Sequence, residues 1–147
     1  MKSEPSVYGI DDLERDGSTS WGGVRNYQVR NMFRDGFNVD DLAFFYHSSC
    51  PEPGIVGTMT VERAAYPDPT QFDRKSGYFD PKSRREAPTW LAVDVCFQRK
   101  LARVLALDIL RQTPALADMV VLRRGNRLSV TPVTGKEAKA ILAMVRA

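Results

Sequence analysis

Residues 42–63 read LAFFYHSSCPEPGIVGTMTVER and contain the two most strand-like segments of the chain. Leu42–His47 is rich in aromatic residues, which favour buried strands. Gly54–Arg63 follows with several large apolar residues and is predicted to be its antiparallel partner. Leu91–Phe97 alternates apolar and polar residues in part and is predicted to be a third strand. The sequence therefore predicts a sheet at the centre of the fold.

Helices are predicted before and after these strands. The last helix is the clearest, because Thr134 and Glu137 form a capping box at its start. Its apolar residues recur on one face, at Ala138, Ile141, Leu142 and Val145. Asn26–Arg34 lacks helix breakers and is followed closely by a glycine, which is typical of a helix end. Two shorter helices are predicted at Ile10–Arg15 and Leu107–Gln112.

The remaining segments are predicted from turn residues and short apolar runs. Gly17–Ser20 is predicted to be a loop, and residues 64–89, with four prolines and no clear periodicity, to be a long one. Met119–Leu122 and Leu128–Val133 are predicted to be short strands on either side of a turn. Five or so strands with scattered helices predict an α+β fold with a mostly antiparallel sheet or small barrel. Because no repeat or linker interrupts the sequence, residues 1–147 are expected to form a single domain.

Composition and charge limit the classes of partner. The longest uninterrupted apolar run has five residues, whereas a transmembrane helix needs about 20, so no membrane partner is expected. No secretory signal is visible and Cys50 and Cys96 are too few for a disulfide framework, so a cytoplasmic protein with reduced thiols is expected. Residues 46–147 carry sixteen basic and ten acidic side chains, a net charge of +6. This excess permits a polyanionic partner without requiring one.

Common catalytic and metal-binding patterns are missing from the sequence. His47 is the single histidine and lies three residues before Cys50, but a structural zinc site takes four ligands. No nucleophile elbow surrounds it, and Gly22-Gly23 is too short for a phosphate-binding loop. We therefore predict no catalytic residues, no metal and no cofactor, and we favour a binding module over an enzyme.

The segment Trp21–Asn31 is the densest in flat and hydrogen-bonding side chains. Trp21 precedes two glycines, and the predicted helix then begins with polar residues. This arrangement suits a planar heterocycle, because the indole stacks on the ring while backbone amides and Asn26 bind its edge. The alternative is that Trp21 anchors the core and Asn26 only caps the helix.

Three other clusters are candidates for a binding site. Tyr46–Ser48 ends the strongest predicted strand, and Tyr66–Pro69 is predicted to form a rigid turn. Each of these clusters either lines a small pocket or has a purely structural role. The third cluster interleaves basic residues with Phe72, Tyr78 and Phe79. Its basic residues are Arg74, Lys75, Lys82, Arg84 and Arg85. Such a segment is either a strip that binds a nucleic-acid backbone or an exposed flexible loop.

Eight segments, in family order, resemble the EVE domain family, a branch of the PUA-like superfamily. They are Lys2–Pro5, Trp21–Asn31, Phe45–Ser48, Pro53–Gly57, Tyr66–Pro69, Tyr78–Lys82, Pro88–Trp90 and Leu128–Val133. The resemblance implies a curved sheet or pseudo-barrel of five or six strands, flanked by short helices. EVE domains are similar to YTH domains, which hold a methylated adenine in an aromatic cage, and they are thought to recognise modified cytosines in DNA.

The resemblance also implies roles for individual residues. Trp21 would be the surface on which the base stacks. The edge of the base would be read by Ser3, Asn26 and the main chain at Gly23 and Val24. Tyr46, His47 and Ser48 would line the opposite wall, and Pro67 and Asp68 the rim. Phosphate contact or polar support would come from Lys2, Glu4, Arg25, Arg30 and Asn31, with Arg25 and Arg30 meeting either a phosphate or an internal carboxylate such as Glu4.

The chain departs from the family pattern at three places. The first strand is cut to Met1 before the Lys-Ser-Glu-Pro segment, so its pairing is in question. Asp40-Asp41 stands where the family usually has Gly-Asp, and Val29 stands where alanine is usual. The leading hypothesis is a non-enzymatic, monomeric module that binds nucleic acid and accepts a flipped base, 5-methyl- or 5-hydroxymethylcytosine in DNA. The alternatives are an RNA-binding module of the PUA-like kind, or a nucleotide sensor or enzyme that uses Arg25, Arg30 and His47.

Overall fold

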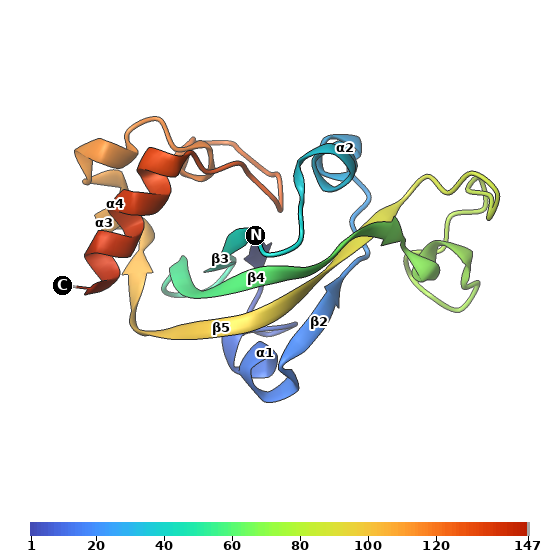
Figure 1. The fold of residues 1–147 in the computed structure, drawn as a ribbon, viewed down its shortest axis with the longest axis horizontal. Coiled ribbons are helices and arrows are strands. Elements are labelled where there is room, and N and C mark those ends of the chain that lie inside the picture. The colour runs from blue at the N-terminus through green and yellow to red at the C-terminus, as the bar shows by residue number, and fades with distance from the viewer. Residues whose placement is uncertain (147) are drawn as a thin grey trace. The chain divides into compact units, whose positions relative to one another are not determined.

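A five-stranded sheet runs through the computed structural model, which describes residues 1–146 (Figure 1). The strands lie in the order β1-β3-β4-β5-β2. Their bounds are Lys2–Ser3 for β1, Ser18–Trp21 for β2, Leu42–His47 for β3, Gly54–Pro67 for β4 and Leu91–Ala106 for β5. The sheet is mixed, because β1 is parallel to β3 and β2 is antiparallel to β5. The predicted α+β class is therefore confirmed.

Within residues 1–146, four α-helices and three short 3-10 helices accompany the sheet. Their bounds are Ile10–Asp16 for α1, Tyr27–Gly36 for α2, Leu107–Arg111 for α3, Gly135–Arg146 for α4, Pro69–Phe72 for η1, Pro114–Leu116 for η2 and Val120–Leu122 for η3. The predicted capping box of α4 is confirmed, because the N–H of Thr134 donates to Glu137 Oε1 and the N–H of Glu137 donates to Thr134 Oγ1. Among residues 1–146, no helix is both long enough and apolar enough to cross a membrane.

Both edge strands, β1 and β2, differ from what the sequence predicts. The segment Lys2–Ser3, whose pairing was in question, does pair, with Lys2 opposite Tyr46 and Ser3 opposite His47. The prediction of a loop at Gly17–Ser20 is wrong, because Ser18–Trp21 is the edge strand β2. Residues with hydroxyl side chains are typical of loops, but the backbone groups of this segment pair with β5. Long-range pairing overrides weak local propensity here.

The prediction of two short strands near the C-terminus is wrong. Met119–Leu122 forms a tight helical turn that buries its first and last side chains. The side chain of Asn126 holds the following turn, because its Nδ2 donates to the Val120 carbonyl while its Oδ1 accepts from the Leu128 N–H. Residues 128–133 contain no strand, although the Ser129 carbonyl accepts a hydrogen bond from the Lys2 N–H. The apolar residues of these two segments are therefore buried in turns and not in strands.

The chain divides into two compact units. The first, called the terminal unit, comprises Met1–Asp12, Phe44–Thr58 and the described residues from Arg99 onward. The second, called the central unit, comprises Leu13–Ala43 and Met59–Gln98. That residues 1–147 form a single domain stays a prediction.

Each unit has its own buried apolar side chains. In the terminal unit, residues of the sheet pack with residues of α3, η2, η3 and α4. This cluster contains Phe44, Tyr46, Ile55, Leu101, Leu110, Leu116, Met119, Leu122 and Ile141. In the central unit, α2 buries Val29 and Phe33, while β4 and β5 bury Val61, Val93 and Val95. Fully burying a side chain of this size contributes roughly 1.5–3 kcal/mol.

The departure at Asp40 occurs at a position with left-handed backbone. Asp40 has φ of +73°, a conformation that glycine adopts without strain and aspartate tolerates better than most residues. Its N–H donates to the Val61 carbonyl, and the Asp41 carbonyl accepts from the Val61 N–H. The turn before β3 is therefore held by backbone hydrogen bonds although the usual glycine is missing.

Candidate functional site

The residues predicted to bind a base lie in both units. The central unit contains Trp21, Gly23, Val24, Arg25, Asn26, Arg30, Asn31, Pro67 and Asp68, together with all five basic residues of the 64–89 segment. The terminal unit contains Lys2, Ser3, Glu4, Tyr46, His47 and Ser48. We therefore describe the geometry of each group separately.

Trp21 is the last residue of β2, where it lies opposite Val93 of β5. Its side chain is half-buried, whereas the second tryptophan of the chain, Trp90, is only 6% exposed. The loop that leads to α2 starts directly after Trp21. Part of the Trp21 side chain is thus accessible to solvent.

Asp68 holds the loop that follows Trp21. The Gly23 N–H donates to Asp68 Oδ2 at 2.7 Å, so this donor is already engaged within the protein. Gly23 has φ of +71°, and a Cβ added there would lie 2.9 Å from the ring of Tyr78. The positive φ therefore favours glycine at this position, whereas a movement of the exposed Tyr78 side chain would relieve the contact with a Cβ.

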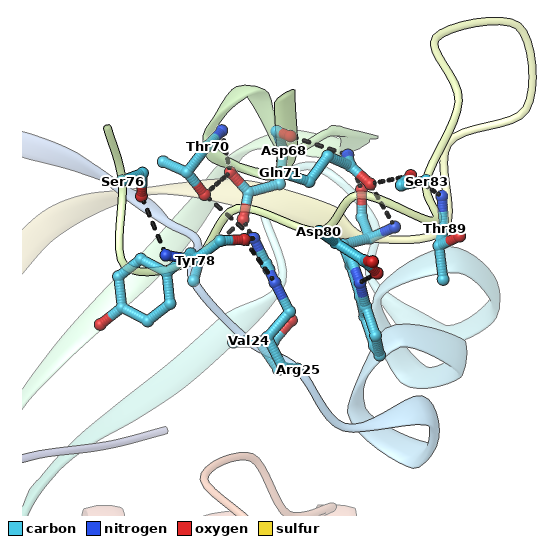
Figure 2. A network of polar contacts seen from close by, with 12 residues as sticks. Val24, Arg25, Asp68, Thr70, Gln71, Ser76, Tyr78, Asp80, Ser83 and Thr89 are labelled. Carbon is cyan, nitrogen blue, oxygen red and sulfur yellow. Dashed lines mark hydrogen bonds and ion pairs between the residues drawn. The ribbon is translucent and has the colours of Figure 1, made fainter. Parts of the chain in front are cut away.

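Arg25 joins this loop to the segment that follows β4. Its Nη1 forms an ion pair with Asp68 Oδ2 at 3.0 Å, and its Nη2 donates to Thr70 Oγ1 and, at 2.8 Å, to the Tyr78 carbonyl (Figure 2). The Asp68 side chain is 1% exposed and that of Arg25 is 22% exposed. The sequence left open whether Arg25 binds a phosphate or an internal carboxylate such as Glu4. In the structure it binds a carboxylate, that of Asp68.

The Asp68 carboxylate is ionised in this setting. Burial by itself raises its pKa, but hydrogen bonds from the Thr70 hydroxyl, the N–H groups of Gly23 and Thr70, and Arg25 outweigh burial and hold the pKa of Asp68 below its usual value. Asp68 is therefore negatively charged at neutral pH, and its hydrogen-bonding capacity is directed at the protein.

The start of α2 has mainly structural contacts. Asn26 is the helix cap, because its Oδ1 accepts from the Val29 N–H at 3.1 Å. Arg30 donates to the Thr89 carbonyl at 3.3 Å and to Asn31 Oδ1 at 3.1 Å. Its guanidinium carbon also lies 4.9 Å from the centre of the Tyr27 ring. The capping role that the sequence analysis gave as an alternative for Asn26 is therefore present.

Gln71 is a structural residue that sequence reasoning missed. It is fully buried, and its Nε2 donates to the carbonyls of Asp68 and Trp90 while its Oε1 accepts from the Trp90 N–H and the Ser83 hydroxyl (Figure 2). Trp90 in turn donates its indole N–H to Asp80 Oδ2 at 2.7 Å. Asp80 and Trp90 lie in segments that resemble the family, but nothing in the sequence marks Gln71.

In the terminal unit, the predicted residues make contacts that hold the fold. The Ser3 hydroxyl donates to the Tyr8 carbonyl at 2.6 Å. Tyr46 packs in the hydrophobic cluster of that unit and is 6% exposed. His47 Nε2 accepts from the Ile10 N–H at 3.1 Å, at the start of α1. Within residues 1–146, no group of three or more His, Cys, Asp or Glu side chains has the arrangement of a metal site.

His47 is expected to make stability depend on pH. Burial lowers its pKa, while Asp11 raises it and Lys100 lowers it by smaller amounts. Because Nε2 accepts a hydrogen bond, the folded protein favours the neutral ring and the unfolded chain binds the proton more tightly. The contribution of neutral His47 is therefore complete above the ordinary pKa of about 6.5 and is lost as the pH falls through the folded-state value.

The measurement is the difference in free energy of unfolding between the wild type and His47→Gln at several pH values. We expect this difference to shrink between pH 8 and pH 5, because only the wild type takes up this proton on unfolding. A difference that stays constant across this range would contradict the assignment of His47 as a neutral acceptor.

Comparison with known proteins identifies the family. The family model described as EVE domain matches residues 1–144. The chain belongs to the EVE domain family. Thymocyte nuclear protein 1 of Homo sapiens is 39% identical over 163 residues, covering 98% of this chain and 72% of the human protein. The zebrafish (Danio rerio) protein of the same name is 40% identical, covering 98% of this chain and 70% of its own length.

Solved structures of other EVE domain relatives have the same fold. A crystal structure of a Pseudomonas syringae protein has 47% sequence identity and a TM-score of 0.93, covering 99% of this chain and 97% of that one. The human thymocyte protein, crystallised in complex with DNA that contains 5-methylcytosine, has 39% identity and a TM-score of 0.91, covering 100% of this chain and 96% of that one. The predicted PUA-like architecture of this EVE domain is therefore confirmed.

Proposed function

We propose that this EVE domain binds DNA and recognises a modified cytosine, 5-methyl- or 5-hydroxymethylcytosine. The observation that carries the proposal is the human relative, which is 39% identical across the whole chain, has a TM-score of 0.91 and was crystallised with DNA containing 5-methylcytosine. Identity at this level along the whole chain supports a shared class of ligand.

Trp21 is the proposed stacking surface for the base. Trp21 is half-buried at the end of β2, so the residue is partly accessible to solvent. Flipping a base out of a duplex costs a few kcal/mol. Stacking on an aromatic ring returns about 1–3 kcal/mol per base, and edge hydrogen bonds add to it. A buried methyl group adds roughly 1 kcal/mol, which favours the modified base.

Arg25 and Asp68 are proposed to be positioning residues. Their charges are directed at each other and at the loop backbone, with Asp68 accepting from the Gly23 N–H and Arg25 donating to the Tyr78 carbonyl. These contacts fix the loop beside Trp21 before any ligand arrives. A preformed loop lowers the entropy cost of binding.

The proposal is tested by measuring dissociation constants for a panel of oligonucleotides. The panel contains three duplexes of one sequence, which carry 5-methylcytosine, 5-hydroxymethylcytosine or unmodified cytosine at the same site. It also contains the matching RNA and the free nucleoside 5-methyl-2′-deoxycytidine. We expect the tightest binding for a modified DNA duplex, with an affinity that falls as salt increases. Equal affinity for modified and unmodified duplexes would contradict base recognition. Tighter binding of RNA, or salt-independent binding of the nucleoside alone, would favour the RNA-binding or sensor alternative.

A further inference from the structure

The segment of residues 73–89, called the arm, contains no helix and only an isolated bridge between Arg84 and Ala87, yet it is extensively hydrogen-bonded. It lies beyond the end of β4 and leads into β5 (Figure 1). The buried Gln71 side chain binds the Ser83 hydroxyl, which in turn accepts from the Thr89 N–H. The Gln71 carbonyl also accepts from the Asp80 N–H. These contacts give the arm a defined shape.

Two acidic residues of the arm hold its turns. Asp73 Oδ1 accepts from the Lys75 N–H at 2.9 Å, and Asp80 Oδ1 accepts from the Lys82 N–H at 2.9 Å. Asp80 Oδ2 accepts from the indole N–H of Trp90. Their carboxylates accept hydrogen bonds from backbone and indole donors within the central unit, and no ion pair joins them to the basic side chains of the arm in the described part of the chain.

The basic side chains of the arm point into solvent. Arg74, Lys75, Lys82, Arg84 and Arg85 are all exposed. No ion pair of these five residues is found within the described part of the chain. One of them has a fixed aromatic neighbour, since the Arg85 guanidinium carbon lies 4.8 Å from the centre of the Phe72 ring. A shaped loop that displays unpaired cations suits a polyanion.

We propose that the arm binds the phosphate backbone of the nucleic acid, independently of the base that is recognised. This inference rests on the proposed function and adds to it a second surface. Arg25 connects the two, because both its Nε and its Nη2 donate to the Tyr78 carbonyl within the arm while its Nη1 binds Asp68. The bound phosphates therefore lie at a set distance from Trp21. Arg25 acts as a positioning residue.

The test removes charge from the arm and leaves in place the side chains that shape it. The variant is Arg74→Gln/Lys75→Gln/Lys82→Gln/Arg84→Gln. The matched control is Arg123→Gln/Arg124→Gln/Lys136→Gln/Lys139→Gln, which removes two arginines and two lysines from exposed positions of the terminal unit. Thermal unfolding verifies that both variants are folded. The affinities of each protein for a 5-methylcytosine duplex and for its unmodified counterpart are measured between 50 and 200 mM salt.

We expect the arm variant to lose affinity for both duplexes by the same factor. Each lost phosphate contact makes the slope of log K against log salt shallower by about 0.9, so two lost contacts change the salt effect over this range by roughly tenfold. The control variant should keep the wild-type slope. An unchanged slope in the arm variant, or an equal change in the control, would overturn the proposal for the arm.

The outcomes also separate this inference from the proposed function. If the wild type prefers the modified duplex and the arm variant keeps the wild-type salt slope, the proposal for the arm is wrong and base recognition is supported. A wild type that binds both duplexes equally, with a slope that the arm variant flattens, would refute base recognition and support the arm. A wild type that binds neither duplex would refute both.

Discussion

Asp68→Ala is expected to destabilise the protein by about 3 kcal/mol. Removing one member of a buried ion pair costs about 3–5 kcal/mol, because the partner is left buried without compensation. We expect the lower end of that range, since the Arg25 side chain retains 22% exposure and solvent partly compensates its charge. The variant also leaves the N–H groups of Gly23 and Thr70 without their acceptor.

The control for this variant is Asp73→Ala, in the same region of the chain. Asp73 is exposed and its carboxylate accepts a hydrogen bond from the Lys75 N–H, so we expect a loss below about 1 kcal/mol. Urea unfolding of the two variants and the wild type gives the comparison. If Asp68→Ala costs no more than Asp73→Ala, Asp68 does not hold the loop as described.

Trp21→Ala is expected to remove the preference for the modified base. The loss of stacking, about 1–3 kcal/mol, corresponds to a 5- to 150-fold weaker affinity for the 5-methylcytosine duplex. Binding of the unmodified duplex should change little, and the salt dependence should remain, because the basic residues of the arm are untouched.

Trp21→Phe is the conservative control, since it keeps an aromatic ring at the end of β2. We expect it to retain part of the preference. A preference that persists in full in Trp21→Ala would mean that another side chain recognises the base.

The sequence predicted the elements whose signal is local. Leu42–His47 was predicted with the bounds that β3 has, and the capping box of α4 at Thr134 and Glu137 is present. Ser18–Trp21 was missed because it is an edge strand whose backbone pairs with a distant strand. Val130 is buried, but in a turn instead of a strand. Burial alone does not distinguish these two structures.

The candidate site could be predicted only in part. The segments Trp21–Asn31 and Tyr66–Pro69, the second of which contains Asp68, were singled out from their residue types, and the family resemblance then implied a place for Asp68 at the rim of the pocket. The partner of Arg25 was not predictable, because Asp68 lies 43 residues away and other carboxylates were available. Gln71 was missed because its role depends on burial beside Trp90, 19 residues later, which no local pattern shows.

The most direct test of the central claim uses the two indole N–H resonances of the protein, since the chain has two tryptophans. Trp90 provides the comparison, because its indole N–H is bound to Asp80 of the arm and the residue is 6% exposed, so it reports on binding that both duplexes share. In a ¹⁵N-labelled sample, we predict a large shift of the Trp21 resonance with a 5-methylcytosine duplex and a smaller one with the unmodified duplex, whereas the shift at Trp90 should be the same with both. A Trp21 resonance that stays in place while the modified duplex saturates the protein would contradict the claim that this indole meets the base.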